Sequence, residues 1–145
     1  MAQTSASLEV PATADRVWQL IGGFNSLPDW LPLIADSELS EGGRVRHLKT
    51  ADGHVIIERL EAFDQNARSY SYSIMEAPFP ASDYLATLSV QEVAGTGSSL
   101  VTWSGSFSPV GVSDIEVVQL FHRIYEEGLV ALNDSLQSGD KESLR

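Results

Sequence analysis

The stretch from residue 113 to residue 138, SDIEVVQLFHRIYEEGLVALNDSLQS, decides the predicted fold. Its apolar residues recur at steps of three and four, which places them on one face of an α-helix. These residues are Val118, Phe121, Tyr125, Leu129, Leu132 and Leu136. Ser113 is the expected N-cap, Glu116 completes a capping box, and Gly139 is the expected end of the helix. A helix with one apolar face must pack against another element, and we expect that element to be a sheet.

Short alternating stretches separated by turn residues precede this helix and predict seven strands. The expected strands are 5–10, 34–39, 44–49, 54–63, 69–74, 84–93 and 99–108. Two short helices, over 13–21 and 25–31, are expected between the first and second strands. Tight turns such as Asp52-Gly53 make consecutive strands antiparallel. The predicted fold class is α+β, with a curved, seven-stranded antiparallel sheet around a long C-terminal helix in a single domain over 1–145.

Composition and charge exclude several classes of function. The chain has 9 Lys and Arg against 20 Asp and Glu, a net charge of −11, which disfavours nucleic acids and anionic membranes. It has no cysteine, and its 3 histidines have no metal-ligand spacing. No apolar run approaches the length of a bilayer span, and residues 1–7 do not resemble a secretory signal. We therefore expect a cytoplasmic monomer or homodimer without metal, cofactor, nucleic-acid partner or stable membrane association.

The concave face of the predicted sheet is expected to line a cavity for a small molecule, because apolar pockets with a few polar groups are typical of such sites. The sheet residues assigned to this face are Val45, His47, Glu58, Leu60, Tyr72, Ile74, Tyr84, Ala86, Leu88, Trp103 and Phe107. The helix contributes Phe121, Tyr125 and Leu129, and the mouth includes Trp30 and Leu31. Arg46 and Arg59 are assigned to the outer face.

Glu58 is the strongest candidate for a functional polar group. Its strand is apolar on both faces, so alternation does not decide which way its carboxylate points. If it is buried, Glu58 needs a partner or has a raised pKa, and it could anchor a ligand hydroxyl or act as a general base. Its candidate partners are then His47, Tyr72 and Tyr84. In the alternative, Glu58 is solvated and pairs with Arg44, Arg46 or Arg59.

Several motifs, in order, carry a family resemblance over nearly the whole chain. They are VPATADRVW at 10–18, DWLP at 29–32, GRVR at 43–46, DG at 52–53, ERLEA at 58–62, YSY at 70–72, Tyr84 and TW at 102–103. Together they resemble the polyketide cyclase/dehydrase branch of the START (SRPBCC) superfamily, whose fold is the helix grip. That fold hosts lipid carriers, hormone receptors and cyclases, so the resemblance implies a ligand cavity without specifying one function.

The chain also resembles, more distantly, the plant abscisic-acid receptors. Residues that match Glu58 and Tyr84 face the cavity of those receptors, which implies polar ligand contacts for both here. The lysine that pairs with the hormone carboxylate is replaced by Ala35, and the gate loop of the receptors is replaced by Ala51-Asp52-Gly53. Binding of an anionic hormone of that type is therefore not implied.

Three functions remain open from the sequence. The first is binding of a small hydrophobic ligand, either aromatic, polyketide-like or lipid-like, between the sheet and the last helix. The second is a polyketide cyclase or dehydratase in which Glu58 or His47 moves a proton while Tyr72 or Tyr84 holds a carbonyl or enolate oxygen. The third is a protein-interaction role in which side chains fill the pocket.

Overall fold

The computed structural model describes residues 1–143, and it describes the side chains of residues 1–137. Its elements follow the order that the sequence predicts. They are β1 (Ala2–Val10), α1 (Ala14–Ile21), the 3-10 helix η1 (Leu27–Asp29), β2 (Ile34–Ser40), the 3-10 helix η2 (Glu41–Gly43), β3 (Val45–Thr50), β4 (Val55–Asp64), β5 (Ser69–Glu76), β6 (Ala81–Val93), β7 (Ser98–Pro109) and α2 (Asp114–Ser143). The predicted fold class is confirmed.

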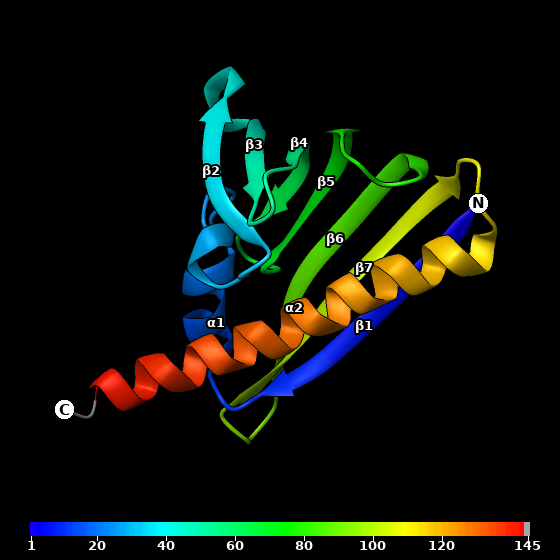
Figure 1. Cartoon of the computed structure of the whole chain (residues 1–145). Helices are drawn as coiled ribbons and strands as arrows, with labels where there is room; N and C mark the ends of the chain where they lie inside the picture. Colours follow the sequence, from blue (N-terminus) through cyan, green and yellow to red (C-terminus); the bar gives the residue numbers. More distant parts are fainter. Residues whose placement is uncertain (144–145) are drawn as a thin grey trace.

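The seven strands form one antiparallel sheet in the order β1-β7-β6-β5-β4-β3-β2. The first and last strands of the chain are therefore neighbours, and Ala6 of β1 pairs with Trp103 of β7. Breaks in register occur twice between β4 and β5, once between β6 and β7, and once between β2 and β3. Because such bulges bend and twist a strand, they add curvature to the sheet. Figure 1 shows α2 lying across the sheet, alongside β1 and β7.

The ends of the long helix follow the predicted signals at one terminus only. The backbone N–H of Glu116 donates to the Ser113 hydroxyl at 3.2 Å, as expected of the N-cap. The helix does not end at Gly139, however, and its backbone continues to Ser143. A glycine costs a helix only about 1 kcal/mol relative to alanine, so it permits an end without enforcing one.

The apolar face of α2 is buried against the sheet, as predicted, with one correction in the first turn. Val117 is fully buried there, whereas Val118 is only half-buried. Val117 lies four residues before Phe121, so it continues the row of i, i+4 neighbours along the face. The remaining predicted positions are all buried: Phe121, Tyr125, Leu129, Leu132 and Leu136.

The segment between β1 and β2 differs most from the prediction. Thr13 caps α1 as expected, since its hydroxyl accepts from the backbone N–H of Arg16 at 3.3 Å. The second expected helix is reduced to the 3-10 turn of η1, which contains Pro28. Trp30 follows directly and is buried, with its ring edge-on to Trp103 at 6.0 Å.

Among the described residues, no helix combines the length and apolarity needed to cross a bilayer.

Candidate functional site

A small cavity lies between the sheet and α2, with a volume of about 40 Å³. Eight of the residues predicted for the site line it: Leu31, Glu58, Tyr72, Ile74, Tyr84, Trp103, Phe121 and Tyr125. Eight others that were not predicted complete the lining: Leu27, Leu33, Ile34, Arg46, Leu48, Ile56, Phe79 and Ile124. Small-molecule pockets usually have roughly 300–1,000 Å³, so this cavity holds at most a few water molecules as it stands.

The other predicted residues lie around the cavity rather than on its wall. Trp30, Ala86, Leu88, Phe107 and Leu129 belong to the surrounding hydrophobic core, and half-buried Leu60 packs against that core. Val45 is buried but is not part of this core. These residues support the site without reaching its interior.

The predicted inward orientation of His47 and outward orientation of Arg46 are both wrong. His47 is exposed on the outer face of β3, where its Nε2 lies 2.8 Å from the Ser40 hydroxyl. Arg46 points inward and is only 1% exposed. A buried guanidinium is stable only when charge and hydrogen-bond partners surround it, and hydropathy alone does not reveal such partners. Here the partner is Glu58, which lies opposite Arg46 in the β3–β4 register.

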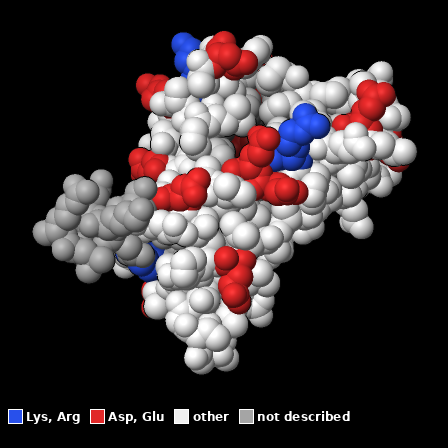
Figure 2. All heavy atoms as spheres, turned by 60° about the horizontal axis from the view of Figure 1, so that its bottom comes forward, with Lys and Arg blue, Asp and Glu red and all other residues white. Residues whose placement is uncertain are grey.

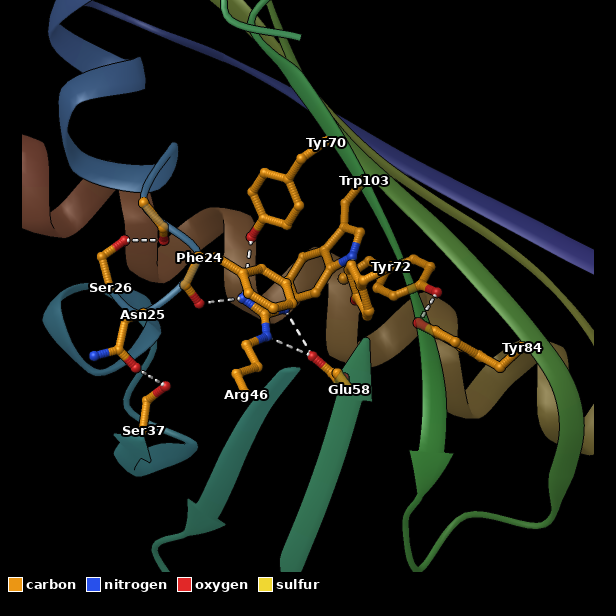
Figure 3. A network of polar contacts seen from close by, with 12 residues as sticks. Phe24, Asn25, Ser26, Ser37, Arg46, Glu58, Tyr70, Tyr72, Tyr84 and Trp103 are labelled. Atoms are coloured by element: carbon orange, nitrogen blue, oxygen red, sulfur yellow. Dashed lines mark hydrogen bonds and ion pairs between the residues drawn. The ribbon is translucent and has the colours of Figure 1, made fainter. Parts of the chain in front are cut away.

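Arg46 is held by five groups that surround its guanidinium (Figure 3). Its Nε and Nη2 donate to the same oxygen of Glu58, Oε1, at 2.8 and 2.7 Å. Its Nη1 donates to the Phe24 carbonyl at 2.9 Å and to the Tyr70 hydroxyl at 3.4 Å. The Phe24 ring centroid lies 4.1 Å from Arg46 Cζ and the Tyr72 centroid lies 4.9 Å away, both within cation–π range. The protein itself therefore neutralises this cation.

Glu58 lines the cavity, and Arg46 binds only one of its two carboxylate oxygens. Both Arg46 contacts fall on Oε1, and no described residue donates a hydrogen bond to Oε2. Burial raises the pKa of the Glu58 carboxyl, and the charge and hydrogen bond of Arg46 oppose that rise. Burial by itself would lower the pKa of Arg46, but Tyr70 and Glu58 outweigh it, so that pKa is raised. Glu58 can therefore accept a hydrogen bond from a molecule in the cavity.

Three tyrosine hydroxyls meet at the same cavity. The hydroxyls of Tyr84 and Tyr125 are hydrogen-bonded to each other, and the indole N–H of Trp103 donates to the Tyr72 hydroxyl at 3.0 Å. Burial raises the pKa of Tyr72, Tyr84 and Tyr125, so all three are neutral phenols at physiological pH. Together they offer hydroxyl donors and acceptors but no charge.

Two glycines allow α2 to approach the sheet at the site. A Cβ added at Gly105 of β7 would lie 2.2 Å from the Tyr125 hydroxyl oxygen. A Cβ added at Gly128 of α2 would lie 2.7 Å from the Trp103 ring and 3.2 Å from Leu31. Both contacts are too close for any larger residue without rearrangement, so these glycines set the position of Tyr125 and Trp103.

A larger cleft of about 480 Å³ opens beside the cavity. It lies between α2 and three loops, which precede β2, join β3 to β4, and join β5 to β6. Its lining residues are Leu31, Pro32, Leu33, Thr50, Asp52, His54, Pro78, Phe79, Ile124, Glu127, Gly128 and Ala131. Leu31, Leu33, Phe79 and Ile124 line both spaces, and we call these four residues the neck. The neck side chains thus form a wall that the cleft shares with the cavity lined by Glu58 and the tyrosines.

Comparison with known proteins assigns the chain to a family. Residues 1–137 match the model of the family described as polyketide cyclase/dehydrase and lipid transport. The chain belongs to this family. The resemblance drawn from the sequence motifs is thereby confirmed.

Solved structures with the same fold come from several bacteria. XoxI from Bacillus cereus is 58% identical, with a TM-score of 0.90 over 93% of this chain and 95% of that one. A protein from Bacillus thuringiensis is 57% identical, with a TM-score of 0.91 over 92% of this chain and 98% of that one. The ZhuI aromatase/cyclase from a Streptomyces species is 16% identical, with a TM-score of 0.74 over 99% of this chain and 95% of that one. At that identity, the last likeness concerns the fold alone.

Metal ligands are not grouped in this site. Among residues whose side chains are described, no three or more His, Asp or Glu side chains converge as a metal site would require. The polar groups that line the cavity are the paired Arg46 and Glu58 side chains, three phenols and the Trp103 indole N–H.

Proposed function

We propose that the protein binds a small hydrophobic molecule whose apolar body occupies the cleft and whose polar group reaches the cavity. The observation that carries this proposal is the cleft of about 480 Å³, which has the volume of a typical ligand pocket and adjoins the buried polar groups. Membership of a family described as polyketide cyclase/dehydrase and lipid transport supports it. The interior alone, nearly filled by its own side chains, would favour a protein-interaction role instead.

Access to the cavity requires the neck to open, and Phe79 is the residue best placed to move. Phe79 lies in the loop 77–80 between Pro78 and Pro80, and its ring contacts Phe121 edge-on at 5.3 Å. It is only half-buried, so its ring can turn toward solvent without disrupting a strand. A ligand that takes its place would restore the apolar contact with Phe121. The proposed complex thus needs a side-chain movement and no change in the sheet.

The test compares two substitutions on neighbouring residues of α2. Ala131 lines the cleft, whereas Val130 is exposed and does not line it. We expect Nile red, a neutral apolar dye, to fluoresce more strongly with the wild-type protein, and Ala131→Phe to weaken its binding about tenfold by filling the cleft. Val130→Phe should bind the dye as the wild type does.

Equal binding by the wild type and both variants would exclude the cleft as the binding site. Native mass spectrometry of protein purified without denaturation provides an independent check. A co-purified small molecule that Ala131→Phe loses and Val130→Phe retains would identify the natural ligand. A bound molecule retained by both variants would contradict the proposal.

A second candidate function is cyclase or dehydratase chemistry, and one observation favours it. Glu58 has one carboxylate oxygen without a hydrogen-bond donor among the described residues, and it lines the same cavity as Tyr72 and Tyr84. In such a reaction Glu58 would take a proton from carbon as general base, while a tyrosine hydroxyl would stabilise the enolate oxygen. His47, which faces outward, has no part in this mechanism.

Hydrogen exchange tests this second candidate without a known substrate. An aromatic ketone with α-protons is incubated in D2O, and the exchange of these protons is followed by NMR. The exchange should be faster with the wild-type protein than in buffer alone. Tyr84→Phe should slow that exchange about a hundredfold by removing one stabilising donor, while the ketone remains bound. Binding without accelerated exchange in the wild type would leave ligand binding as the only function.

A further inference from the structure

The mouth of the cleft carries negative charge and no side-chain cation of its own. Asp52 and Glu127 line it, and no Lys or Arg does so among the described residues. Hydrogen bonds from Thr50 and His54 lower the pKa of Asp52, which is therefore ionised at physiological pH. His54 Nδ1 lies 3.0 Å from that same carboxylate, so any charge on His54 is already paired. The face drawn in Figure 2 also shows more acidic than basic side chains.

The interior offers no free positive charge either. Arg46 is the only Lys or Arg side chain lining the cavity among the described residues. Its contacts with Glu58, the Phe24 carbonyl and Tyr70 leave its charge compensated. Glu58 also lines the cavity, and its Oε2, which accepts no hydrogen bond from a described residue, can accept one from a ligand but cannot donate one to an anion.

We infer that this site selects uncharged ligands that carry a hydroxyl donor, such as aromatic alcohols or phenols, and excludes carboxylates. The inference rests on the proposed function and deepens it. An anionic ligand would approach Asp52 and Glu127 at the mouth, and inside it would meet the Arg46–Glu58 pair, which is neutral overall and offers the anion no unpaired cation. A ligand hydroxyl, in contrast, can donate to Glu58 Oε2, and hydrogen bonds to charged acceptors are the strong ones.

Three probes that share one ring system separate charge from hydrogen bonding. They are 1-naphthylmethanol, its methyl ether, and 1-naphthoate, and their dissociation constants are measured at pH 7 by isothermal titration calorimetry. We expect the alcohol to bind at least about tenfold more tightly than the ether, which lacks the donor, and than the naphthoate, which is repelled. The same ring in all three keeps the apolar contribution constant.

The outcomes distinguish this inference from the proposed function. If naphthoate binds as tightly as the alcohol, the charge selection is wrong, although ligand binding stands. If the ether equals the alcohol, the role of Glu58 Oε2 as acceptor is wrong. If none of the three probes binds, both the inference and the proposed function fail together.

Two matched charge reversals on α2 test whether the negative charge at the mouth of the cleft affects ligand selection. Glu127 lines the cleft, whereas Glu126 is exposed beside it, does not line it, and pairs with His122 at 3.0 Å. The measured quantity is the affinity for naphthoate relative to the affinity for the alcohol. Glu127→Lys should raise this ratio about tenfold, whereas Glu126→Lys should change it by less than about twofold. Equal effects of the two variants would show that only net charge matters and would overturn the inference for the mouth.

A double variant tests the interior without leaving an unpaired buried charge. Arg46→Met combined with Glu58→Leu removes both members of the ion pair, and such replacements are often tolerated. The preference for alcohol over ether should then disappear, with the ether bound at least as well as before. If the preference persists in the double variant, the acceptor is another group and the inference is wrong. Circular dichroism spectra that match the wild type establish that the variant is folded.

Discussion

The space between α2 and the sheet is filled differently at its two ends. At the end near α1, which we call the closed end, a guanidinium N–H of Arg16 donates to the Leu136 carbonyl of α2 at 3.1 Å. The buried side chains of that end include aliphatic residues of both helices: Val17, Ile21, Leu132 and Leu136. At the other end, the open end, lie the Arg46–Glu58 pair, three tyrosine hydroxyls, the cavity and the cleft.

This difference separates what stabilises the fold from what the fold can do. Burying aliphatic side chains stabilises the closed end by about 1.5–3 kcal/mol for each side chain. A buried ion pair contributes little net stability, because desolvation offsets its attraction. Net stability therefore does not explain the polar groups of the open end, whereas the proposed hydrogen bonds to a ligand would.

The largest expected effect comes from breaking the ion pair at the open end. Arg46→Met leaves the Glu58 carboxylate buried without its partner and should lower the free energy of unfolding by about 3–5 kcal/mol, as should Glu58→Leu. The free energy of unfolding should decrease less in the double variant than in either single variant. Urea denaturation of all four proteins measures the coupling. If the decrease in the free energy of unfolding of the double variant equals the sum of the two single decreases, the two charges act independently.

At the closed end, Leu132→Ala should create a cavity and lower the free energy of unfolding by about 2–5 kcal/mol. Leu132 is fully buried and lines neither the cleft nor the cavity. The affinity of the folded variant for Nile red should therefore stay unchanged. Urea denaturation and dye titration give the two values. A loss of affinity in proportion to stability would contradict the separation of the two ends.

Disturbing the close contact between Tyr125 and the sheet should lower stability by a smaller amount, and a second substitution should restore part of it. Gly105→Ala places a methyl group against the Tyr125 hydroxyl and should cost about 1–3 kcal/mol. Adding Tyr125→Phe removes that oxygen and should recover part of the loss. Thermal or urea unfolding of the single and double variants measures this. An unchanged cost in the double variant would place the strain elsewhere.

Alkaline pH should destabilise the protein through the tyrosines of the open end. Their pKa values are raised in the folded state, so above about pH 10 the unfolded chain releases protons that the folded protein retains. The free energy of unfolding should then fall as pH rises, by at most about 1.4 kcal/mol per pH unit for each such tyrosine. Tyr84→Phe should reduce this slope by one proton. An unchanged slope would mean that Tyr84 ionises normally.

The incorrect or missing predictions for the site concern strand β3 and the loop 77–80. Placing His47 inside and Arg46 outside followed from strand alternation with Val45 on the inner face, yet a usable signal was present in the chain. The turn Ala51-Asp52-Gly53 is centred on Asp52, so that Arg46 falls opposite Glu58, as the β3–β4 register shows. Pairing across the predicted turn would have suggested this ion pair. Phe79 offered only a weaker signal, an aromatic residue between two prolines.

The sequence by itself determined the order of the elements, the buried face of α2 from Phe121 onward, and the family. These properties follow from local periodicity, caps and turns, which involve residues close together in the chain. Only the tertiary structure decided that Arg46 points inward, that the interior is small, and that Phe79 helps to close it. Those properties depend on sheet curvature and on packing between distant segments, and no local pattern records either.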